Sequence, residues 1–362
     1  MANVNQNKSA APNADEKEPN YSIPVPRVGV KEPLKLLIQT VYYFVIFVPL
    51  IVWDVISNFL TKPKSIRNSV VLITGSGRGL GRNLALKFAE LNCNVACVDL
   101  DETNNADTVR LIKKKYPSVK AIAYKCNVAL VDDIKNLSKN VSNDLGEVDI
   151  IINNAGLVSG ANIVRSKLDT KYLDVMLDVN LKSHFLMIGV FLPKMIERNS
   201  GHIVAIASLA GLNGVPNGAA YSATKHGVVG FMESLYDELK TVPNNKIQTS
   251  CICPYFIATN EAYPETWDLR IPEISVNEAT EAIIDAITRN KRIVAIPSHM
   301  YHISILTRLL PDRLRNIGQE IFYARINPPE KEITNNIDAV IEDSLNRKES
   351  NKKQTPSSDY SE

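Results

Sequence analysis

A serine, a tyrosine and a lysine in the second half of the chain have the spacing of a proton-transfer site. Ser208 follows a predicted strand, and Tyr221 and Lys225 lie four residues apart in a predicted apolar helix. Positions four apart share one face of a helix, so we expect the Lys225 ammonium beneath the Tyr221 phenol. A phenol has a pKa of about 10 and is a poor base at neutral pH, but a nearby cation lowers that pKa. We predict that Tyr221 moves a proton while Ser208 orients the reacting oxygen.

A glycine-rich run earlier in the chain offers a place for a dinucleotide, and it lies between a predicted strand and a predicted helix. Glycines let the backbone approach a pyrophosphate, and a helix N-terminus offers unpaired N–H groups and a positive dipole. A nucleoside-triphosphate loop is the rival interpretation, but it requires Gly-Lys-Ser/Thr where Arg82-Asn83 stands. A nicotinamide cofactor would move a hydride while Tyr221 moves the proton, and its ring would join Lys225 in lowering the pKa of the phenol. The predicted cofactor residues here are Thr74, Gly75, Ser76, Arg78, Gly79, Leu80 and Gly81.

The adenosine end of the dinucleotide is expected to contact Asp99, which ends the second predicted strand. A carboxylate there binds both ribose hydroxyls and repels a 2′-phosphate, which favours NAD. Arg78 favours the opposite choice, because a guanidinium in the glycine loop can pair with the 2′-phosphate of NADP. The sequence therefore predicts NAD, with NADP as the alternative.

The elements that must position these residues are visible as short runs of Val and Ile that alternate with longer amphipathic stretches. Such runs are typical of strands buried on both faces, and helix-length segments between them indicate parallel βαβ crossovers. A late helix is expected after Ser275, which forms a capping box with Glu278. We predict an α/β fold with one doubly wound, Rossmann-type parallel sheet. The predicted strands are Ser69 to Ile73, Asn94 to Val98, Ala121 to Cys126, Val148 to Ile152, Gly201 to Ile206, Gln248 to Ile252 and Arg292 to Ala295.

Composition argues against several other classes of protein. The chain has 362 residues, and its 41 basic and 39 acidic side chains leave a formal charge of +2, too weak a field to indicate a nucleic-acid partner. Its five cysteines have none of the spacings of zinc sites or disulfide frameworks. We predict no metal site, and reduced core cysteines as in a reducing compartment, at Cys93, Cys97, Cys126, Cys251 and Cys253.

A long apolar run precedes the predicted domain and lies between residues 34 and 61, with no charged residue from Leu36 to Trp53. Its length is about that of a bilayer span, and a basic linker at 62–67 follows it. The sequence therefore predicts a membrane anchor at 34–61. Residues 1–33 and 327–362 have the polar, charged composition of disordered tails.

Two residues complicate a straight crossing of the membrane by this anchor. Pro49 breaks helical hydrogen bonds, and Asp54 is costly in hydrocarbon unless it reaches the interface. A bent insertion into one leaflet therefore stands beside a full crossing. The third alternative is a buried helix of a soluble protein, although a run that is apolar on every side is rare on the surface of a single domain.

A second amphipathic segment, Ile303 to Phe322, lies near the end of the predicted domain. It carries aliphatic residues against Arg308, Arg313 and Arg315, and Pro311 is expected to break or kink it midway. A helix with a basic face can lie on a membrane, but the same pattern packs on a domain or on a dimer partner. Both interpretations stay open from the sequence.

These motifs together resemble the short-chain dehydrogenase/reductase superfamily in its single-domain form, over about residues 68–326. The resemblance rests on the glycine run, Asn153-Asn154-Ala155-Gly156, Asn180, Ser208 and the pair Tyr221 and Lys225. It implies that Asn153–Gly156 stabilises the sheet and lines the cofactor, that Asn180 holds a water in a proton relay, and that Lys225 grips the ribose. The further cofactor residues that it implies are Asn127, Asn154, Ala155, Gly156, Pro254, Ile257 and Thr259, with Tyr221 and Lys225.

Two residues depart from the family's usual pattern. Asn127 stands where an Asp is common near the adenine, and Tyr255 follows Pro254 in place of the common Gly. The run Cys253 to Phe256, the apolar anchor and Asp99 resemble the branch that contains epidermal retinol dehydrogenase and 17-beta-hydroxysteroid dehydrogenase 11/13-type enzymes. That branch implies retinoid, steroid or other lipid alcohols as substrates, at the endoplasmic reticulum or lipid droplets with the domain in the cytosol.

The expected activity is therefore NAD(P)-dependent interconversion of a lipophilic alcohol and its carbonyl. Two alternatives remain: reduction of ketones with NADPH, and a membrane or lipid-droplet surface protein with minor turnover. We expect the substrate walls at Leu209 to Val215 and at Tyr255 to Trp267. A homodimer, if the chain forms one, is expected to use the segments Tyr172 to Lys194 and Tyr221 to Leu239.

Overall fold

The computed structural model describes residue 49 and residues 62–158, 170–259, 267–321 and 324–326. The predicted tails, and the predicted anchor apart from Pro49, lie outside the described residues. The chain divides into two units, Met1–Leu60 and Thr61–Glu362, and the fold below belongs to the second.

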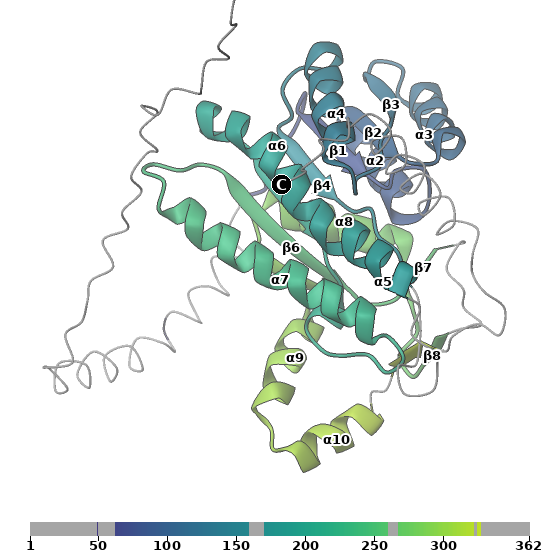
Figure 1. The fold of residues 1–362 in the computed structure, drawn as a ribbon, viewed down its shortest axis with the longest axis vertical. Helices are drawn as coiled ribbons and strands as arrows, with labels where there is room; N and C mark the ends of the chain where they lie inside the picture. Colours follow the sequence, from purple (N-terminus) through teal and green to yellow (C-terminus); the bar gives the residue numbers. More distant parts are fainter. Residues whose placement is uncertain (1–48, 50–61, 159–169, 260–266, 322–323, 327–362) are drawn as a thin grey trace, which may run out of the picture. The chain divides into compact units, whose positions relative to one another are not determined.

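A parallel sheet of seven strands forms the centre of this unit (Figure 1). The strand order is β10-β6-β5-β4-β1-β2-β3, and every neighbouring pair is parallel. The chain first winds outward from β1 and then restarts at β4, which is the doubly wound topology that the sequence predicts. All seven predicted strands are confirmed to within two residues at each end. The strands are β1 Val70–Thr74, β2 Asn94–Asp99, β3 Ala121–Lys125, β4 Ile150–Asn153, β5 His202–Ile206, β6 Gln248–Pro254 and β10 Ile293–Ile296.

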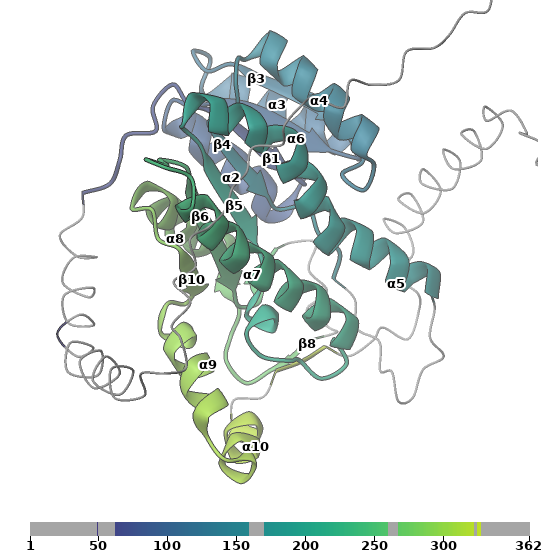
Figure 2. The ribbon, with the colours of Figure 1, turned by 60° about the vertical axis from the view of Figure 1, so that its left-hand side comes forward.

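Alternate residues of each strand point to opposite faces, and a separate hydrophobic core lies on each face. In β1, for example, Val71 and Ile73 pack into one core, whereas Val70 and Leu72 pack into the other. The first core is covered by α2 Gly79–Glu90, α3 Glu102–Lys115 and α8 Val276–Thr288. The second is covered by α4 Val131–Asp144, α6 Ser183–Arg198 and α7 Ala219–Lys240 (Figure 2).

Three local predictions are also confirmed. The Ser275 hydroxyl accepts the N–H of Glu278 at 3.1 Å and so caps the start of α8. Pro311 separates two helices, α9 His299–Leu309 and α10 Asp312–Ile321. All five cysteines are buried and free. The remaining described elements are η2 Leu209–Gly211, β7 Ile257–Ala258, β8 Trp267–Leu269, β9 Ile274–Ser275 and β11 Ala324–Ile326.

One continuous helix, residues 170–198, is long and apolar enough to cross a membrane by length and composition. It consists of α5 Thr170–Leu177, the π-helical turn η1 Asp178–Lys182 and α6. Met187, Phe191 and Met195 of this helix are buried in the second core, so packing inside the domain accounts for its apolar composition. It is a different segment from the predicted anchor at 34–61.

Candidate active site

The glycine run forms the turn between β1 and α2, and its glycines are required by the backbone. Gly75 and Gly79 have φ values of +68° and +54°, which side chains disfavour. A Cβ on Gly81 would lie 1.9 Å from the carbonyl oxygen of Gly75, so the helix can approach the loop only with glycine there. No side chain caps the first turn of α2, which leaves N–H groups at this helix start for a bound anion. The turn therefore fits the predicted pyrophosphate of a dinucleotide.

Three of the predicted cofactor residues in this region use their side chains to hold the protein together. The Thr74 hydroxyl accepts the N–H groups of Asn154 and Ala155, each at 3.0 Å, and the Asn154 amide donates to the carbonyl of Thr74 at 2.9 Å. These bonds join the ends of β1 and β4, as the resemblance implies. The buried Ser76 hydroxyl donates to Asn105 at 2.8 Å. Ser76 can therefore meet a cofactor only through its backbone.

Asn153 differs from its neighbour in this respect. Both polar atoms of its buried side chain lack a hydrogen-bond partner among the described residues. The stabilisation of the sheet that the resemblance implies is thus found at Asn154, and the Asn153 side chain makes no such bond to the described part of the protein.

Asp99 lies at the end of β2, directly against the glycine loop. One of its carboxylate oxygens accepts the N–H of Gly77 at 2.7 Å, and the other accepts the N–H of Asp101 at 2.9 Å. Each carboxylate oxygen has a second lone pair, so Asp99 can still accept the ribose hydroxyls beside the loop. Arg78 is exposed, and its charge contributes to the lowered pKa of Asp101, after the larger effect of hydrogen bonds from Asn104.

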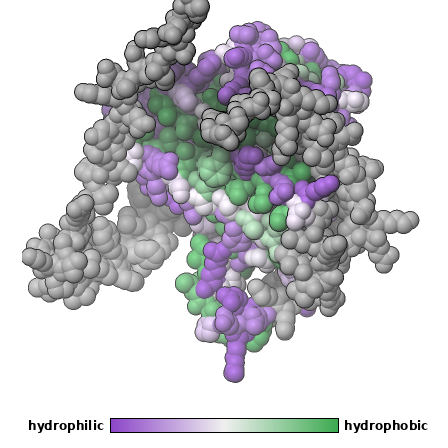
Figure 3. Space-filling view, in the orientation of Figure 1, coloured by the Kyte–Doolittle hydropathy of each residue, from purple (hydrophilic) through white to green (hydrophobic). Residues whose placement is uncertain are grey.

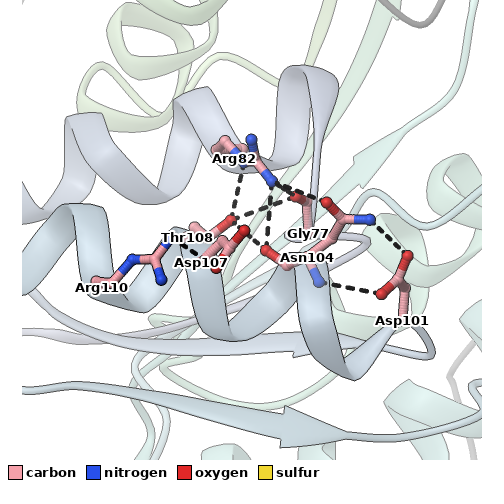
Figure 4. Close-up of polar contacts among 7 residues, drawn as sticks. All are labelled: Gly77, Arg82, Asp101, Asn104, Asp107, Thr108 and Arg110. Atoms are coloured by element: carbon pink, nitrogen blue, oxygen red, sulfur yellow. Dashed lines mark hydrogen bonds and ion pairs between the residues drawn. The ribbon is translucent and has the colours of Figure 1, made fainter.

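Arg82, on the first turns of α2, braces the same loop against α3 (Figure 4). Its guanidinium donates to the carbonyl of Gly77 and to the Thr108 hydroxyl, the latter at 3.0 Å. The hydroxyl of Thr108 in turn donates to the Ser76 carbonyl at 2.9 Å. Sequence reasoning used Arg82 only to argue against a nucleoside-triphosphate loop, because only the fold brings α3 beside this turn.

Ser208, Tyr221 and Lys225 are brought together at the carboxyl end of β5. Ser208 follows this strand, and its hydroxyl lies close enough to the Tyr221 phenol to oppose, by hydrogen bonding, a rise in the phenol's pKa. Tyr221 lies on the first turn of α7, and the Lys225 Nζ lies 5.7 Å from the centre of its ring. The Lys225 ammonium also donates to the carbonyl of Ile206 at 2.9 Å, which fixes it against the end of β5. The predicted arrangement of the three side chains is therefore present.

Burial dominates the electrostatics of this cluster. It raises the pKa of Tyr221, and the hydrogen-bonding effect of Ser208 opposes that rise. Loss of hydration also lowers the pKa of Lys225 to about 8. The predicted lowering of the phenol pKa by Lys225 together with the nicotinamide ring stays a prediction.

Asn180 lies in the π-helical turn η1, a kind of turn that is frequent at functional sites. Its side-chain oxygen accepts the N–H of Leu157 at 2.7 Å, and its amide donates to the carbonyl of the same residue at 2.8 Å. A Cβ on Gly156 would lie 3.4 Å from the Asn180 side-chain oxygen and 3.5 Å from the Lys225 Nζ. Asn180 and Lys225 thus meet at Gly156, while the predicted water between them stays a prediction.

The other predicted residues line the same edge of the sheet. Asn127 follows β3, where its side-chain oxygen accepts the N–H of Ala129 at 3.0 Å. Pro254 ends β6 and pairs with Ile296 of β10. Ile257 belongs to β7, and Thr259 donates its N–H to the carbonyl of Ile257 at 2.8 Å. Within the expected substrate walls, residues 209–215 and 255–259 are described, whereas 260–266 lie outside the described residues.

Comparison with known proteins decides the family. The family model described as short chain dehydrogenase matches residues 69–267. The chain belongs to the short-chain dehydrogenase/reductase family. It is therefore an oxidoreductase of the kind that acts on CH–OH groups with NAD or NADP.

Similar curated proteins belong to the branch that the sequence indicates. Epidermal retinol dehydrogenase 2 of Mus musculus is 35% identical over 257 residues, which cover 70% of this chain and 82% of that protein. The short-chain dehydrogenase/reductase family 16C member 6 of Bos taurus is 34% identical, with 75% and 87% covered. The 17-beta-hydroxysteroid dehydrogenase 13 of Homo sapiens is 32% identical, with 70% and 82% covered.

Solved structures agree in fold. A short-chain dehydrogenase/reductase from Burkholderia phymatum in complex with NAD superposes with a TM-score of 0.60 at 24% identity, covering 74% of this chain and 99% of that one. A metagenomic short-chain oxidoreductase in complex with NADP has a TM-score of 0.53 at 26% identity, covering 64% and 96%. The two complexes hold different dinucleotides, so the comparison leaves the choice between NAD and NADP to the residues of this chain.

Proposed function

We propose that this enzyme interconverts a lipophilic alcohol and its carbonyl compound, with NAD as the cofactor and Tyr221 as the acid/base. The observation that carries the proposal is the clustering of Ser208, Tyr221 and Lys225 at the end of β5, with the Lys225 Nζ 5.7 Å from the centre of the Tyr221 ring. Two neighbouring hydroxyls at the end of β5 can both bond an alcohol oxygen between them. Such a site can hold the oxygen and exchange its proton.

Each residue has one task in the oxidation. Ser208 donates a hydrogen bond to the substrate oxygen, and Tyr221 takes the hydroxyl proton after Lys225 and a bound nicotinamide ring have lowered the pKa of its phenol. Bound NAD would supply the acceptor for the hydride from the carbinol carbon. Lys225 holds a positive charge beside the phenol and donates to the ribose, and Asn180, which meets Lys225 at Gly156, connects it to the relay. In the reverse direction Tyr221 returns the proton to the carbonyl oxygen.

We propose NAD on the strength of Asp99. Its carboxylate is fixed on the glycine loop by the Gly77 N–H at 2.7 Å, where it would face the ribose hydroxyls and repel a 2′-phosphate. Arg78, the residue that favoured NADP, directly follows Gly77 in the loop, is exposed, and contributes its charge to the lowered pKa of Asp101.

The proposal also includes a lipophilic substrate and a location at a membrane or lipid droplet. Relatives of this chain are named as retinol and estradiol dehydrogenases, and the walls beyond Ser208 contain Leu209, Leu212 and Tyr255. An anchor at 34–61 would hold the domain of residues 68–326 on the cytosolic side of the endoplasmic reticulum or on lipid droplets, beside a reservoir of such alcohols. The exposed Phe185, whose ring centre lies 4.4 Å from that of Phe231 with the planes tilted by 49°, supports the proposal that a homodimer would use α6 and α7.

A substrate panel tests this proposal. Full-length protein reconstituted in membranes would be assayed with a retinoid, a sterol and a long-chain fatty alcohol, and NADH formation would be followed by absorbance. We expect turnover with at least one of them, and loss of that turnover in Ser208→Ala. If the enzyme only reduces ketones with NADPH, the proposed direction and cofactor are wrong. If none of the lipid alcohols is turned over, the proposed substrate class is wrong.

A further inference from the structure

The helices α9 and α10 carry an aliphatic surface that the domain leaves uncovered. We define this surface by its seven exposed members: Ile303, Ile305, Leu306, Leu309, Leu310, Leu314 and Ile317. The side chain of Leu309 is 76% exposed and that of Leu306 is 60% exposed. Soluble monomers seldom present so many contiguous aliphatic side chains, and such a patch marks an interaction site. Figure 2 shows these helices extending from the sheet. Figure 3 shows hydrophobic beside hydrophilic residues on this part of the molecule.

The inner side of α9 fixes this surface in place. The Asn213 amide donates to the buried Ser304 hydroxyl at 2.5 Å, and the Arg308 guanidinium donates to the carbonyl of Leu212. Arg308 also lies 3.1 Å from the His226 ring nitrogen, next to Lys225 in α7. Leu212 and Asn213 belong to the segment that follows Ser208. The aliphatic surface is thus attached to the wall of the active site.

The chemistry of the surface favours lipid over a protein partner. Its members are all Leu and Ile, whereas the energetic centres of protein interfaces are enriched in Trp, Tyr and Arg and poor in Leu. Residues 311–317 are exposed without exception, and α10 is strongly amphipathic with low overall hydrophobicity, as helices at membrane interfaces are. Arg313 and Arg315 flank the aliphatic side chains and suit anionic headgroups, with Arg315 also paired to Asp312 at 2.6 Å.

We propose that α9 and α10 lie on an anionic phospholipid surface, with the aliphatic side chains in the boundary between headgroups and acyl chains. This contact is separate from the proposed anchor at 34–61. It places the segment after Ser208 at the lipid surface, so that an apolar alcohol reaches Tyr221 without crossing water. The second statement rests on the proposed function, whereas the lipid contact itself does not.

The contact can be tested in the full chain because all five native cysteines are buried. Leu309→Cys supplies a single accessible thiol for an environment-sensitive fluorophore, and Leu111→Cys on α3, where the native side chain is 41% exposed, is the matched control. Both would be reconstituted in phosphatidylcholine vesicles with about 30 mol% phosphatidylserine, with and without a lipid that carries a spin label on its acyl chain. We expect blue-shifted emission and spin-label quenching at 309, and neither at 111.

Each other outcome overturns either the lipid contact or its dependence on anionic headgroups. Long-wavelength emission without quenching at 309 would mean that the surface faces water. Blue-shifted emission without quenching would mean that protein covers it, either a second copy or another segment of this chain, and crosslinking between two 309 thiols would identify the second copy. Quenching that is unchanged when phosphatidylserine is omitted and when Arg313 is replaced by Gln would remove the role of anionic headgroups.

Substrate delivery needs a separate assay. Leu309→Asn combined with Leu314→Asn should raise the KM for a long-chain alcohol in vesicles by about tenfold, since two Leu side chains no longer enter the lipid. The KM for a short, water-soluble alcohol and the kcat for both should stay the same. An unchanged KM for the lipid alcohol, with quenching at 309 intact, would contradict the proposed delivery of substrate from the lipid but would leave the lipid contact supported. Lack of turnover in the wild-type enzyme would contradict the proposed function alone.

Discussion

The proposed preference for NAD depends on one carboxylate, and Asp99→Ala tests it. Asp99 accepts the N–H of Gly77 at 2.7 Å and that of Asp101 at 2.9 Å, so its position on the glycine loop is fixed before a cofactor binds. A hydrogen bond to a charged group contributes about 1.5–3 kcal/mol. Loss of one such bond to the ribose should weaken NAD binding by about 10- to 150-fold, because each 1.4 kcal/mol is about a factor of ten.

The same substitution should improve NADP binding. Two unit charges at about 4 Å repel by about 4 kcal/mol at the effective dielectric constant of a protein surface, and the 2′-phosphate no longer meets a carboxylate in the variant. The ratio of NAD to NADP affinity should therefore fall by about a hundredfold or more. Fluorescence titration with NADH and NADPH measures both dissociation constants directly.

Asp101→Ala is the matched control for this experiment. Asp101 caps α3 by accepting the N–H of Asn104 at 3.0 Å, so its loss should cost about 1 kcal/mol of stability without a change in the cofactor ratio. An unchanged ratio in Asp99→Ala would refute the assignment of Asp99 to the ribose. An equal change of the cofactor ratio in both variants would show that disturbance of the loop, rather than a direct contact with the ribose, determines the preference.

Three further predictions concern the framework of the site. Gly81→Ala places a Cβ 1.9 Å from the Gly75 oxygen and should abolish NADH binding in a fluorescence titration. Gly189→Ala, in open space on α6, should retain that binding. Equal NADH binding by the two variants would contradict the required close approach of α2 to the glycine loop. Arg82→Met should lower the free energy of unfolding by about 1–3 kcal/mol in urea titrations, because the Gly77 carbonyl loses its donor, against about 0.5 kcal/mol or less for the exposed Arg110→Met. Burial lowers the pKa of His184 to about 3 and that of His202 well below its usual value, so below pH of about 6.5 the unfolded chain binds two protons that the folded chain does not. Stability should then fall by up to about 2.7 kcal/mol per pH unit as the pH decreases, and urea midpoints that are equal at pH 7 and pH 5 would contradict this.

The parts of this fold that follow from local pattern were predictable. The seven strands are continuous apolar runs because both faces of the sheet are covered, and Ser275 and Pro311 mark helix ends by their own backbone chemistry. The site residues Ser208, Tyr221 and Lys225 were predictable because their spacing matches the strand end and the helix that carry them.

Other features depend on contacts between distant segments, and no local pattern encodes them. The π-helical turn at Asn180 inserts a residue without any glycine or proline to signal it. Arg82 has its role only because α3 packs beside α2. The raised pKa of Tyr221 depends on burial, which the distance of four residues to Lys225 does not reveal.

Tyr221→Phe is the most direct test of the proposed chemistry, because it removes one oxygen and keeps the ring. NADH binding should stay within about twofold of wild type, since the ring and Lys225 keep their places, while kcat for oxidation of the best alcohol should fall by about a hundredfold or more across the pH range. A variant that binds NADH normally and still oxidises the alcohol at the wild-type rate would contradict the assignment of Tyr221 as the acid/base.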